Sequence, residues 1–251
     1  MKIPLLALVA AAPAFAQWLN YPTPGIPRTP DGKPNLSAPA PKAADGKPDL
    51  SGLWKAPNGK YLFDLAADLK PEDAPFQPWA AAVYKQRVET LGKDRPSGWC
   101  IPHGVPDSMA VAGYPFKILQ LPGMVVMLFE EMNHYRQIFT DGRALPKDPQ
   151  PTWLGYSVGH WEGDAFVVES SGFHEETWLD DPGHPHTAAL RITERFRRPD
   201  FGHLEMQVTI DDPGAYTKPW GAKEIFNYFP DTEILENICE NEKDLKHLVG
   251  K

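Results

Sequence analysis

Alternating apolar and polar positions dominate the second half of the chain and predict a run of β-strands. In residues 203–211 every second side chain is apolar, so one face of that strand is predicted to be buried. Residues 189–198 show the same pattern, except that Glu194 falls on the apolar face. A carboxylate there has a raised pKa unless a cation or a hydrogen-bond donor meets it. It can therefore act as a general acid or base, or pair structurally with Arg136 or Arg143.

Strand-like segments recur through the rest of this region. Eight strands are expected, over residues 116–121, 124–139, 153–162, 164–172, 189–198, 203–211, 221–229 and 232–239. Many of them are joined by short turns such as Pro122-Gly123. This order predicts a mainly β fold, an antiparallel eight-stranded meander closed into a barrel, which removes exposed edges and can enclose one small ligand. A sandwich of two β-sheets is the alternative.

One helix is predicted before the strands, over residues 78–91. Pro78 occupies its first position, alanines follow at 80–82, and Gly92 supplies the stop signal. Its broad apolar side is expected to pack against a sheet. The apolar residues on that side are Trp79, Val83, Tyr84, Val88 and Leu91.

The segment before the helix is rich in proline and is predicted to be an extended arm, residues 17–57. It carries a short repeat, Asp31-Gly-Lys-Pro-Asn-Leu-Ser and Asp45-Gly-Lys-Pro-Asp-Leu-Ser. Each copy joins a turn signal to one apolar anchor, Leu36 or Leu50. Residues 58–251 are predicted to form a single domain that includes the helix.

Residues 1–16 have the features of a secretory signal peptide. Lys2 precedes an apolar run that ends in Ala14-Phe15-Ala16, a pattern that signal peptidase accepts. Cleavage near Ala16 removes one basic residue and leaves 24 basic against 33 acidic residues, a net charge of −9. Such a charge argues against nucleic acid or an anionic membrane surface as a partner. With no second long apolar run, the mature protein is predicted to be periplasmic or secreted without a membrane span.

Export also bears on the two cysteines, Cys100 and Cys239. They are the only pair in the chain, and an oxidising compartment favours a disulfide between them. Closing a loop of this length stabilises the folded state by up to roughly 4–5 kcal/mol in the chain-entropy model. A reactive thiol or a metal ligand is the alternative.

Charged residues also interrupt the apolar run 124–139. Alternation places His134 and Arg136 on one face, and Glu131 and Asn133 on the other. One of these faces must line an interior, and a bulge in the strand exchanges them. Glu169 raises the same question, because both faces of its strand look buried.

The polar connection 173–186 is the segment richest in titratable groups. It holds three of the eight histidines, with Glu175, Glu176, Asp180 and Asp181. His184 and His186 stand two apart, so in an extended segment their rings project to the same side. They suit a proton-transfer pair with a carboxylate. They also suit a metal site completed by Asp180, His174 or Glu194, and a purely structural loop is the third interpretation.

Sequence signatures of other enzyme classes are missing. Gly155-Tyr-Ser-Val-Gly has the letters of a nucleophile elbow, but it lies among strands with no helix after it, so Ser157 is not expected to be an acyl nucleophile. No phosphate-binding loop, Rossmann glycine pattern or CxxC pair occurs.

Several motifs together resemble a largely uncharacterised family of exported bacterial proteins. They are Phe139-Thr-Asp-Gly-Arg, the run from Pro151 to Glu169 with Trp161-Glu-Gly-Asp-Ala-Phe-Val-Val-Glu, Gly183-His-Pro-His with Ala189-Leu-Arg-Ile-Thr-Glu-Arg-Phe, and Val208-Thr-Ile-Asp-Asp-Pro. The likeness covers about Asp45 to the C-terminus. It implies export and a single domain, and no particular reaction. The predicted strand order is also similar to lipocalin-type (calycin) barrels, by architecture only.

From these patterns we expect an exported enzyme that acts on a small, partly apolar organic molecule by acid–base chemistry, as a lyase, isomerase or hydrolase. The catalytic candidates are His184, His186, Asp180, Glu194 and Glu131, with Asp181 as another carboxylate that can orient the histidines. The substrate-binding candidates are Arg136, Trp178, Asn133 and Glu169. No cofactor is predicted, although a divalent metal at His184 and His186 is an open alternative. A non-catalytic carrier of an apolar ligand and an exported metal-binding protein are the other function classes, and the sequence does not indicate an oligomeric state.

Overall fold

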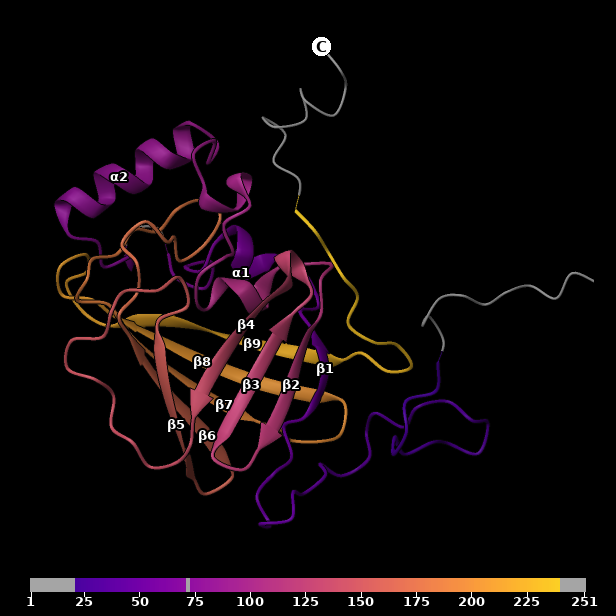
Figure 1. The fold of residues 1–251 in the computed structure, drawn as a ribbon. Coiled ribbons are helices and arrows are strands. Elements are labelled where there is room, and N and C mark those ends of the chain that lie inside the picture. The colour runs from indigo at the N-terminus through magenta and orange to yellow at the C-terminus, as the bar shows by residue number, and fades with distance from the viewer. Residues whose placement is uncertain (1–20, 71–72, 240–251) are drawn as a thin grey trace, which may run out of the picture.

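The computed structural model describes residues 21–70 and 73–239, and in this part of the chain nine strands close into one β-barrel (Figure 1). The strands are β1 (Gly52–Lys55), β2 (Phe116–Leu121), β3 (Met124–Phe129), β4 (His134–Phe139), β5 (Tyr156–Glu162), β6 (Ala165–Ser171), β7 (Arg191–Arg197), β8 (His203–Asp211) and β9 (Trp220–Tyr228). The helices are α1 (Lys60–Phe63), α2 (Pro78–Glu89) and α3 (Asp107–Ala110), with 3₁₀ turns η2 (Pro96–Trp99) and η3 (Glu131–Asn133).

Each strand of the barrel lies beside its neighbours in sequence, and β9 closes the ring on β1. The pairs are antiparallel, apart from β4 and β5, which run parallel and share only two residue pairs, Ile138↔Ser157 and Phe139↔Val158. The first part of β4 therefore lies beside the irregular residues 152–155 instead of a strand. The prediction of a closed, mainly β barrel is confirmed, and its strand count of eight is corrected to nine.

Three differences account for the new count. The expected strand 124–139 is divided into β3 and β4 by the turn η3, in which Met132 and Asn133 have positive φ values of 53° and 47°. The expected strand 232–239 is irregular. It runs past η3, where the side chain of Asn237 accepts from the backbone N–H of Met132 at 3.2 Å. The place beside β9 is taken by β1, a segment that the sequence interpretation had assigned to the arm.

The alternation of apolar positions is confirmed where a strand is regular. Every second residue of β7 and β8 is buried, and Glu194 is fully buried between Ile192 and Phe196. In β3 the odd-numbered residues are buried, whereas in β4 the buried residues are Arg136 and Ile138. The turn η3 thus exchanges the two faces, because it adds residues that have no partner across the ladder.

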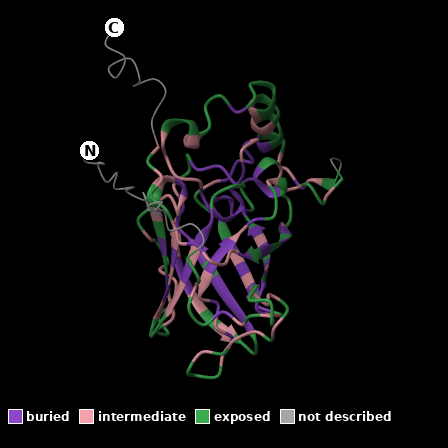
Figure 2. Cartoon of the chain, turned by 90° about the vertical axis from the view of Figure 1, so that its right-hand side faces the viewer, coloured by how far each residue is buried: buried purple, intermediate pink, exposed green. Residues whose placement is uncertain are grey.

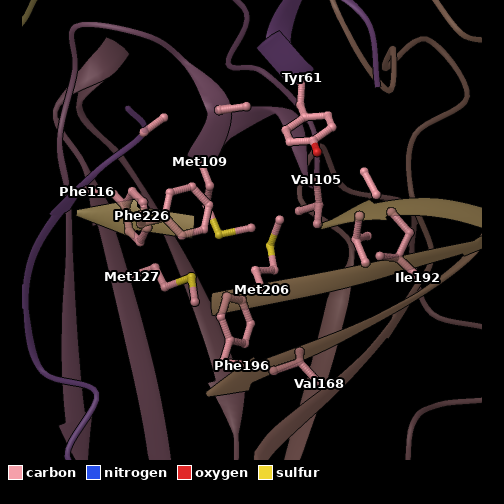
Figure 3. Close-up of a cluster of buried hydrophobic side chains, with 14 of the residues drawn as sticks. Tyr61, Val105, Met109, Phe116, Met127, Val168, Ile192, Phe196, Met206 and Phe226 are labelled. Atoms are coloured by element: carbon pink, nitrogen blue, oxygen red, sulfur yellow. The ribbon is translucent and has the colours of Figure 1, made fainter. Parts of the chain in front are cut away.

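Large side chains fill the barrel. Figure 3 shows Phe116, Phe196 and Phe226 inside the strands, with Met127 and Met206 between them. Tyr61 of α1, Met109 of α3 and Val105 pack onto this cluster from one end of the barrel. Burial of each such side chain stabilises the fold by about 1.5–3 kcal/mol. We call the end covered by α1, α2 and α3 the barrel mouth (Figure 1).

The helix α2 confirms the predicted start at Pro78 and ends close to the predicted stop, but its packing differs from the prediction. Ala80 is its buried residue, while Trp79 and Val88 are exposed. Most of the helix is exposed, as the colouring by burial in Figure 2 shows. Instead of a sheet, α2 contacts the connection 173–186, where Tyr84 lies against the ring of His184 and Arg87 lies over Trp178. The helix therefore holds that connection over the mouth.

The structure also bears on the predictions made for the two cysteines, the Pro-rich arm and the segments that could cross a membrane. Cys100 and Cys239 form the predicted disulfide, with their Cα atoms 5.5 Å apart. In the described part of the arm, the two repeats form similar turns, closed by the bridges Arg28↔Pro34 and Lys42↔Pro48. The predicted signal peptide, residues 1–16, lies outside the described residues. No helix of the described chain has the length and apolar character needed to cross a membrane.

Candidate functional site at the barrel mouth

Inside the barrel, Arg136 and Glu194 form a buried ion pair. We call this pair, together with Ser157 and Ser170, the interior network. Nη1 of Arg136 donates to Oε1 of Glu194 at 3.0 Å, and Nη2 contacts the other carboxylate oxygen. Nε donates to Ser157 at 3.1 Å, and Nη2 also donates to Ser170 at 2.9 Å. Four of the five N–H donors of the guanidinium are used in this way. The carboxylate of Glu194 thus has a complete set of partners, as the structural interpretation of this residue required.

A second buried pair, Asp180 and His184, fastens the connection 173–186. Nδ1 of His184 donates to Oδ2 of Asp180 at 2.6 Å, and the same oxygen accepts from the backbone N–H of Leu65 at 2.8 Å. The other carboxylate oxygen accepts from the backbone N–H groups of residues 183 and 184. The imidazole ring is enclosed by aromatic rings, namely Phe76, Tyr84 and Trp220. This pair ties the connection to the wall of the mouth.

His186 has a separate set of partners. Its Nδ1 donates to the carbonyl of Thr187 at 3.1 Å, and its Nε2 lies 2.6 Å from the hydroxyl of Thr177. Burial lowers the pKa of His186, so the ring is neutral at physiological pH. Both ring nitrogens are therefore occupied, one by Thr177 of the connection and the other by Thr187 directly after it.

A third group of buried titratable residues, which we call the mouth cluster, is built from three separate segments. It consists of His103, Asp107 at the start of α3, Glu131 of η3, and Asp181. Nε2 of His103 lies 3.3 Å from Oδ1 of Asp181 and 3.8 Å from Oδ2 of Asp107. Nδ1 of the same ring lies 3.2 Å from Oε1 of Glu131, at an angle that does not make a hydrogen bond. One imidazole therefore faces three carboxylates.

The mouth cluster is not fully satisfied by the protein. Oδ1 of Asp107, Oε2 of Glu131 and Nδ1 of His103 are buried and have no hydrogen-bond partner among the described residues. Burial raises the pKa of Asp107 well above its ordinary value, and the neighbouring carboxylates add to this rise against the effect of His103. Burial opposes the charge on His103, but Asp107, Asp181 and Glu131 raise its pKa to about 10. The group is an electrostatically strained centre of the kind found at functional sites.

Two solvent-accessible clefts flank this cluster. The first, which we call the β4 cleft, has a volume of about 530 Å³ and lies where β4 faces the irregular residues 152–155. Its lining includes Pro102, Asn133, His134, Arg136, Trp153 and Tyr156. The short parallel pairing of β4 with β5 leaves this gap in the barrel wall, because a longer ladder would occupy the same space.

The second cleft, of about 540 Å³, lies between α2 and the connection 173–186. Its lining combines tryptophans with charged side chains, and it includes Arg87, Asp94, Trp99, Trp153, Glu175, Glu176 and Trp178. The guanidinium of Arg87 lies 4.2 Å from the ring centre of Trp178. Trp153 stacks on His174 and borders both clefts.

The predicted site residues are distributed over these places. Glu131 belongs to the mouth cluster, Asn133 and Arg136 line the β4 cleft, and Trp178 lines the second cleft. Glu169 is exposed on the outer face of β6. His184, His186 and Glu194 have three separate sets of partners, so the structure does not bring them together on one cavity. Among the described residues, His184 belongs to a possible metal-binding set with Asp64 and Asp180. His186 is not part of that set.

Sequence reasoning missed His103 and Asp107 altogether, and it did not single out His134. His103 stands in a loop without periodicity, and Asp107 occupies the first turn of a helix of four residues. The available signal was their position shortly after Cys100, because the disulfide fixes this loop to the body of the protein. Comparisons of the chain with protein-family models, with curated protein sequences and with solved structures gave no match.

Proposed function

We propose that the protein is an exported enzyme that processes a small, partly apolar organic molecule in the β4 cleft by acid–base chemistry. The observation that carries this proposal is the position of His134 in the wall of that cleft, beside Asn133 and Arg136 and opposite Trp153 and Tyr156. A cleft of about 530 Å³ has the size of ordinary small-molecule sites. Its aromatic side suits the apolar part of a substrate, and its polar side suits the reacting part.

His134 has the properties of a general base. Burial lowers its pKa, so the ring is neutral at pH 7. Nδ1 donates to the carbonyl of Glu131 at 2.8 Å, which leaves the lone pair on Nε2. The nearest hydroxyl, that of Ser108, is 3.3 Å away and has closer acceptors in the carbonyls of His103 at 2.5 Å and Gly104 at 2.9 Å. The Ser108 hydroxyl has one proton and therefore donates to one of these carbonyls in the proposed ground state, which keeps the lone pair of Nε2 available to a substrate.

In the proposed reaction, Nε2 of His134 takes a proton from a C–H group of the substrate in an elimination or isomerisation, or from the water that attacks the carbonyl in a hydrolysis. The imidazolium that forms returns this proton to the leaving group or to the rearranged product, so the enzyme ends its cycle unchanged. Asn133 is the polar side chain of the cleft that positions the substrate. The guanidinium of Arg136 is buried and paired with Glu194, so its part is to hold the strand that carries His134.

The test compares wild-type protein with His134→Gln on a panel of aryl and alkyl esters, lactones and β-hydroxy acids, with products read by mass spectrometry. We expect kcat/KM for the substrate found to fall by about 10²–10⁴-fold in His134→Gln, the usual contribution of a general base. The melting temperature should change little, because glutamine can still donate to the Glu131 carbonyl. The acid limb of the wild-type pH profile should lie below the ordinary histidine pKa.

The matched control is His160→Gln, since His160 is exposed on the outer face of β5 and pairs with Glu162. This variant should turn over substrate at the wild-type rate. Equal activity of wild-type protein and His134→Gln would remove the proposed base.

A second function, a non-catalytic carrier, is favoured by the aromatic lining of the same cleft. The packed interior leaves the wall of the barrel, and not its centre, as the place for a ligand, so the likeness to lipocalin-type barrels is one of architecture. A carrier should co-purify with one small molecule, detectable by mass spectrometry after denaturation. It should bind that molecule unchanged, and with equal affinity, in His134→Gln.

A further inference from the structure

We propose that His103, Asp107 and Asp181 bind one divalent transition-metal cation, such as Zn²⁺ or Mn²⁺, at the barrel mouth. Each residue presents one ligand atom, and these atoms all lie within 4.8 Å of one another. The three residues come from the loop after η2, from α3 and from the connection 173–186, so the fold itself assembles the set. This site goes beyond the proposed function, because none of its three ligands lines the β4 cleft.

The spacing of the ligand atoms fits an ion of this class. At metal–ligand distances of about 2.0–2.2 Å, two ligands of a tetrahedral ion stand about 3.3–3.6 Å apart. Nε2 of His103 lies 3.3 Å from Oδ1 of Asp181 and 3.8 Å from Oδ2 of Asp107. The first distance matches that of two ligands on one ion, and the second is slightly longer, so Asp107 moves toward the ion when it binds.

The space at the cluster and its unpaired charge both favour a bound cation. A hollow of about 10 Å³, close to the space of one water molecule or ion, is lined by His103, Asp107 and Asp181. Asp107 is 3% exposed, and its Oδ1 has no partner in the described chain. A buried carboxylate oxygen without a partner destabilises the folded state, whereas a bound dication supplies the missing charge.

Glu131 completes the arrangement from the far side of the imidazole. A histidine that ligates a metal through one ring nitrogen usually donates the other N–H to a carboxylate, which fixes the ring and raises its basicity. Here Nε2 of His103 faces Asp107 and Asp181, while Nδ1 lies 3.2 Å from Oε1 of Glu131. A small rotation of the Glu131 carboxylate makes this contact a hydrogen bond.

The donor set indicates the class of metal, and the existing hydrogen bonds distinguish this group from its neighbour. One imidazole and two carboxylates suit Zn²⁺ or Mn²⁺ better than Ca²⁺ or Mg²⁺, which take oxygen ligands. The nearby group of Asp64, Asp180 and His184 offers the same donor types. There, however, both oxygens of Asp180 accept from backbone N–H groups. In the mouth cluster, the hydrogen bond between Nε2 of His103 and Oδ1 of Asp181 joins two of the proposed ligands to each other, so an ion between them replaces only that bond. The metal is therefore assigned to the mouth cluster.

The test measures metal content and affinity on untagged mature protein, stripped with EDTA and titrated with ZnCl₂ or MnCl₂ by calorimetry. We expect one ion per chain for wild-type protein and loss of that ion in His103→Gln and Asp181→Asn. Glu131→Gln should weaken binding by about 10–100-fold, the usual effect of losing an outer carboxylate. The control His160→Gln should bind as the wild type does.

Asp181→Asn serves as the principal variant because Asp181 is less deeply buried than Asp107, and within the mouth cluster its carboxylate pairs with His103. Circular dichroism of each variant checks its fold. Absence of a bound ion in wild-type protein would overturn the proposal. So would unchanged affinity in both His103→Gln and Asp181→Asn, or loss of binding in His184→Gln alone, which would move the ion to the neighbouring group. These results are read from metal binding, whereas the proposed function is tested by turnover in His134→Gln, so the two proposals can fail separately.

Discussion

The interior network and the mouth cluster both bury charged side chains, yet they leave those charges in opposite conditions. In the interior network, the guanidinium of Arg136 meets Glu194, Ser157 and Ser170 with good hydrogen-bond geometry. In the mouth cluster, His103 faces three carboxylates, and three buried polar atoms have no partner among the described residues. The first group is complete without a ligand, whereas the second is not.

This difference separates a structural role from a functional one. A buried ion pair is tolerated when each charge has an opposite charge and its remaining donors are satisfied. A buried group with unpaired carboxylate oxygens needs a partner from outside the chain, or it must bind protons. Burial of charge alone therefore does not mark a site, and Glu194, which stands on an apolar face just as a catalytic acid could, belongs to the closed network.

The largest expected effect comes from opening the interior network. Glu194→Ala leaves the guanidinium of Arg136 buried and uncompensated, so the free energy of unfolding should fall by about 3–5 kcal/mol. Chemical denaturation followed by circular dichroism measures this loss. The exposed pair Glu162–Arg195 provides the control, because Glu162→Ala should cost no more than about 1 kcal/mol. A loss for Glu194→Ala as small as that of the control would contradict the role assigned to the network.

Removing the disulfide should have the next largest effect, and it should act on the mouth rather than on the barrel. The double change Cys100→Ser and Cys239→Ser opens a link between residues 139 positions apart. The free energy of unfolding should fall by about 2–4 kcal/mol, mainly because the unfolded chain gains freedom. Hydrogen exchange should accelerate around His103, which lies three residues beyond Cys100, while the amides of β7 and β8 stay protected. Equal acceleration in β7 and β8 would show that the bond holds the whole barrel.

The smallest effect concerns acid stability and His186. Burial lowers the pKa of His186, so the folded protein binds this proton less readily than the unfolded chain does. Its contribution is fully present above the ordinary histidine pKa of about 6.5 and is lost as the pH falls below that value. His186→Gln should therefore flatten the change in denaturation midpoint between pH 7.5 and 5. A steeper change in the variant would reverse the assigned sign.

Much of the fold follows from local patterns in the sequence. Period-two alternation in β7 and β8 depends only on which residues must face the interior, so it located both strands and the burial of Glu194. The sequence also predicted the start of α2 at Pro78 and the pairing of the only two cysteines. It did not predict the turn η3, because that segment contains no glycine or proline and the positive φ values fall on Met132 and Asn133.

The candidate site was far less predictable than the strands. The high density of titratable residues drew attention to the connection 173–186. In the structure, however, His184 and His186 are hydrogen-bonded to Asp180 and Thr177. From that connection only Asp181 reaches the mouth cluster, where it meets His103.

By itself, therefore, the sequence determined where strands form, which of their faces is apolar and which cysteines pair, since these depend on neighbouring residues or on simple counting. Only the tertiary structure decided which charges meet. Arg136 and Glu194 stand 58 positions apart, and His103 and Asp181 stand 78 positions apart. Such meetings depend on the closure of β9 on β1 and on the exchange of faces at η3, and no local pattern encodes either. Whether a buried charge is satisfied is a property of all the segments that surround it, and it is settled only when they come together.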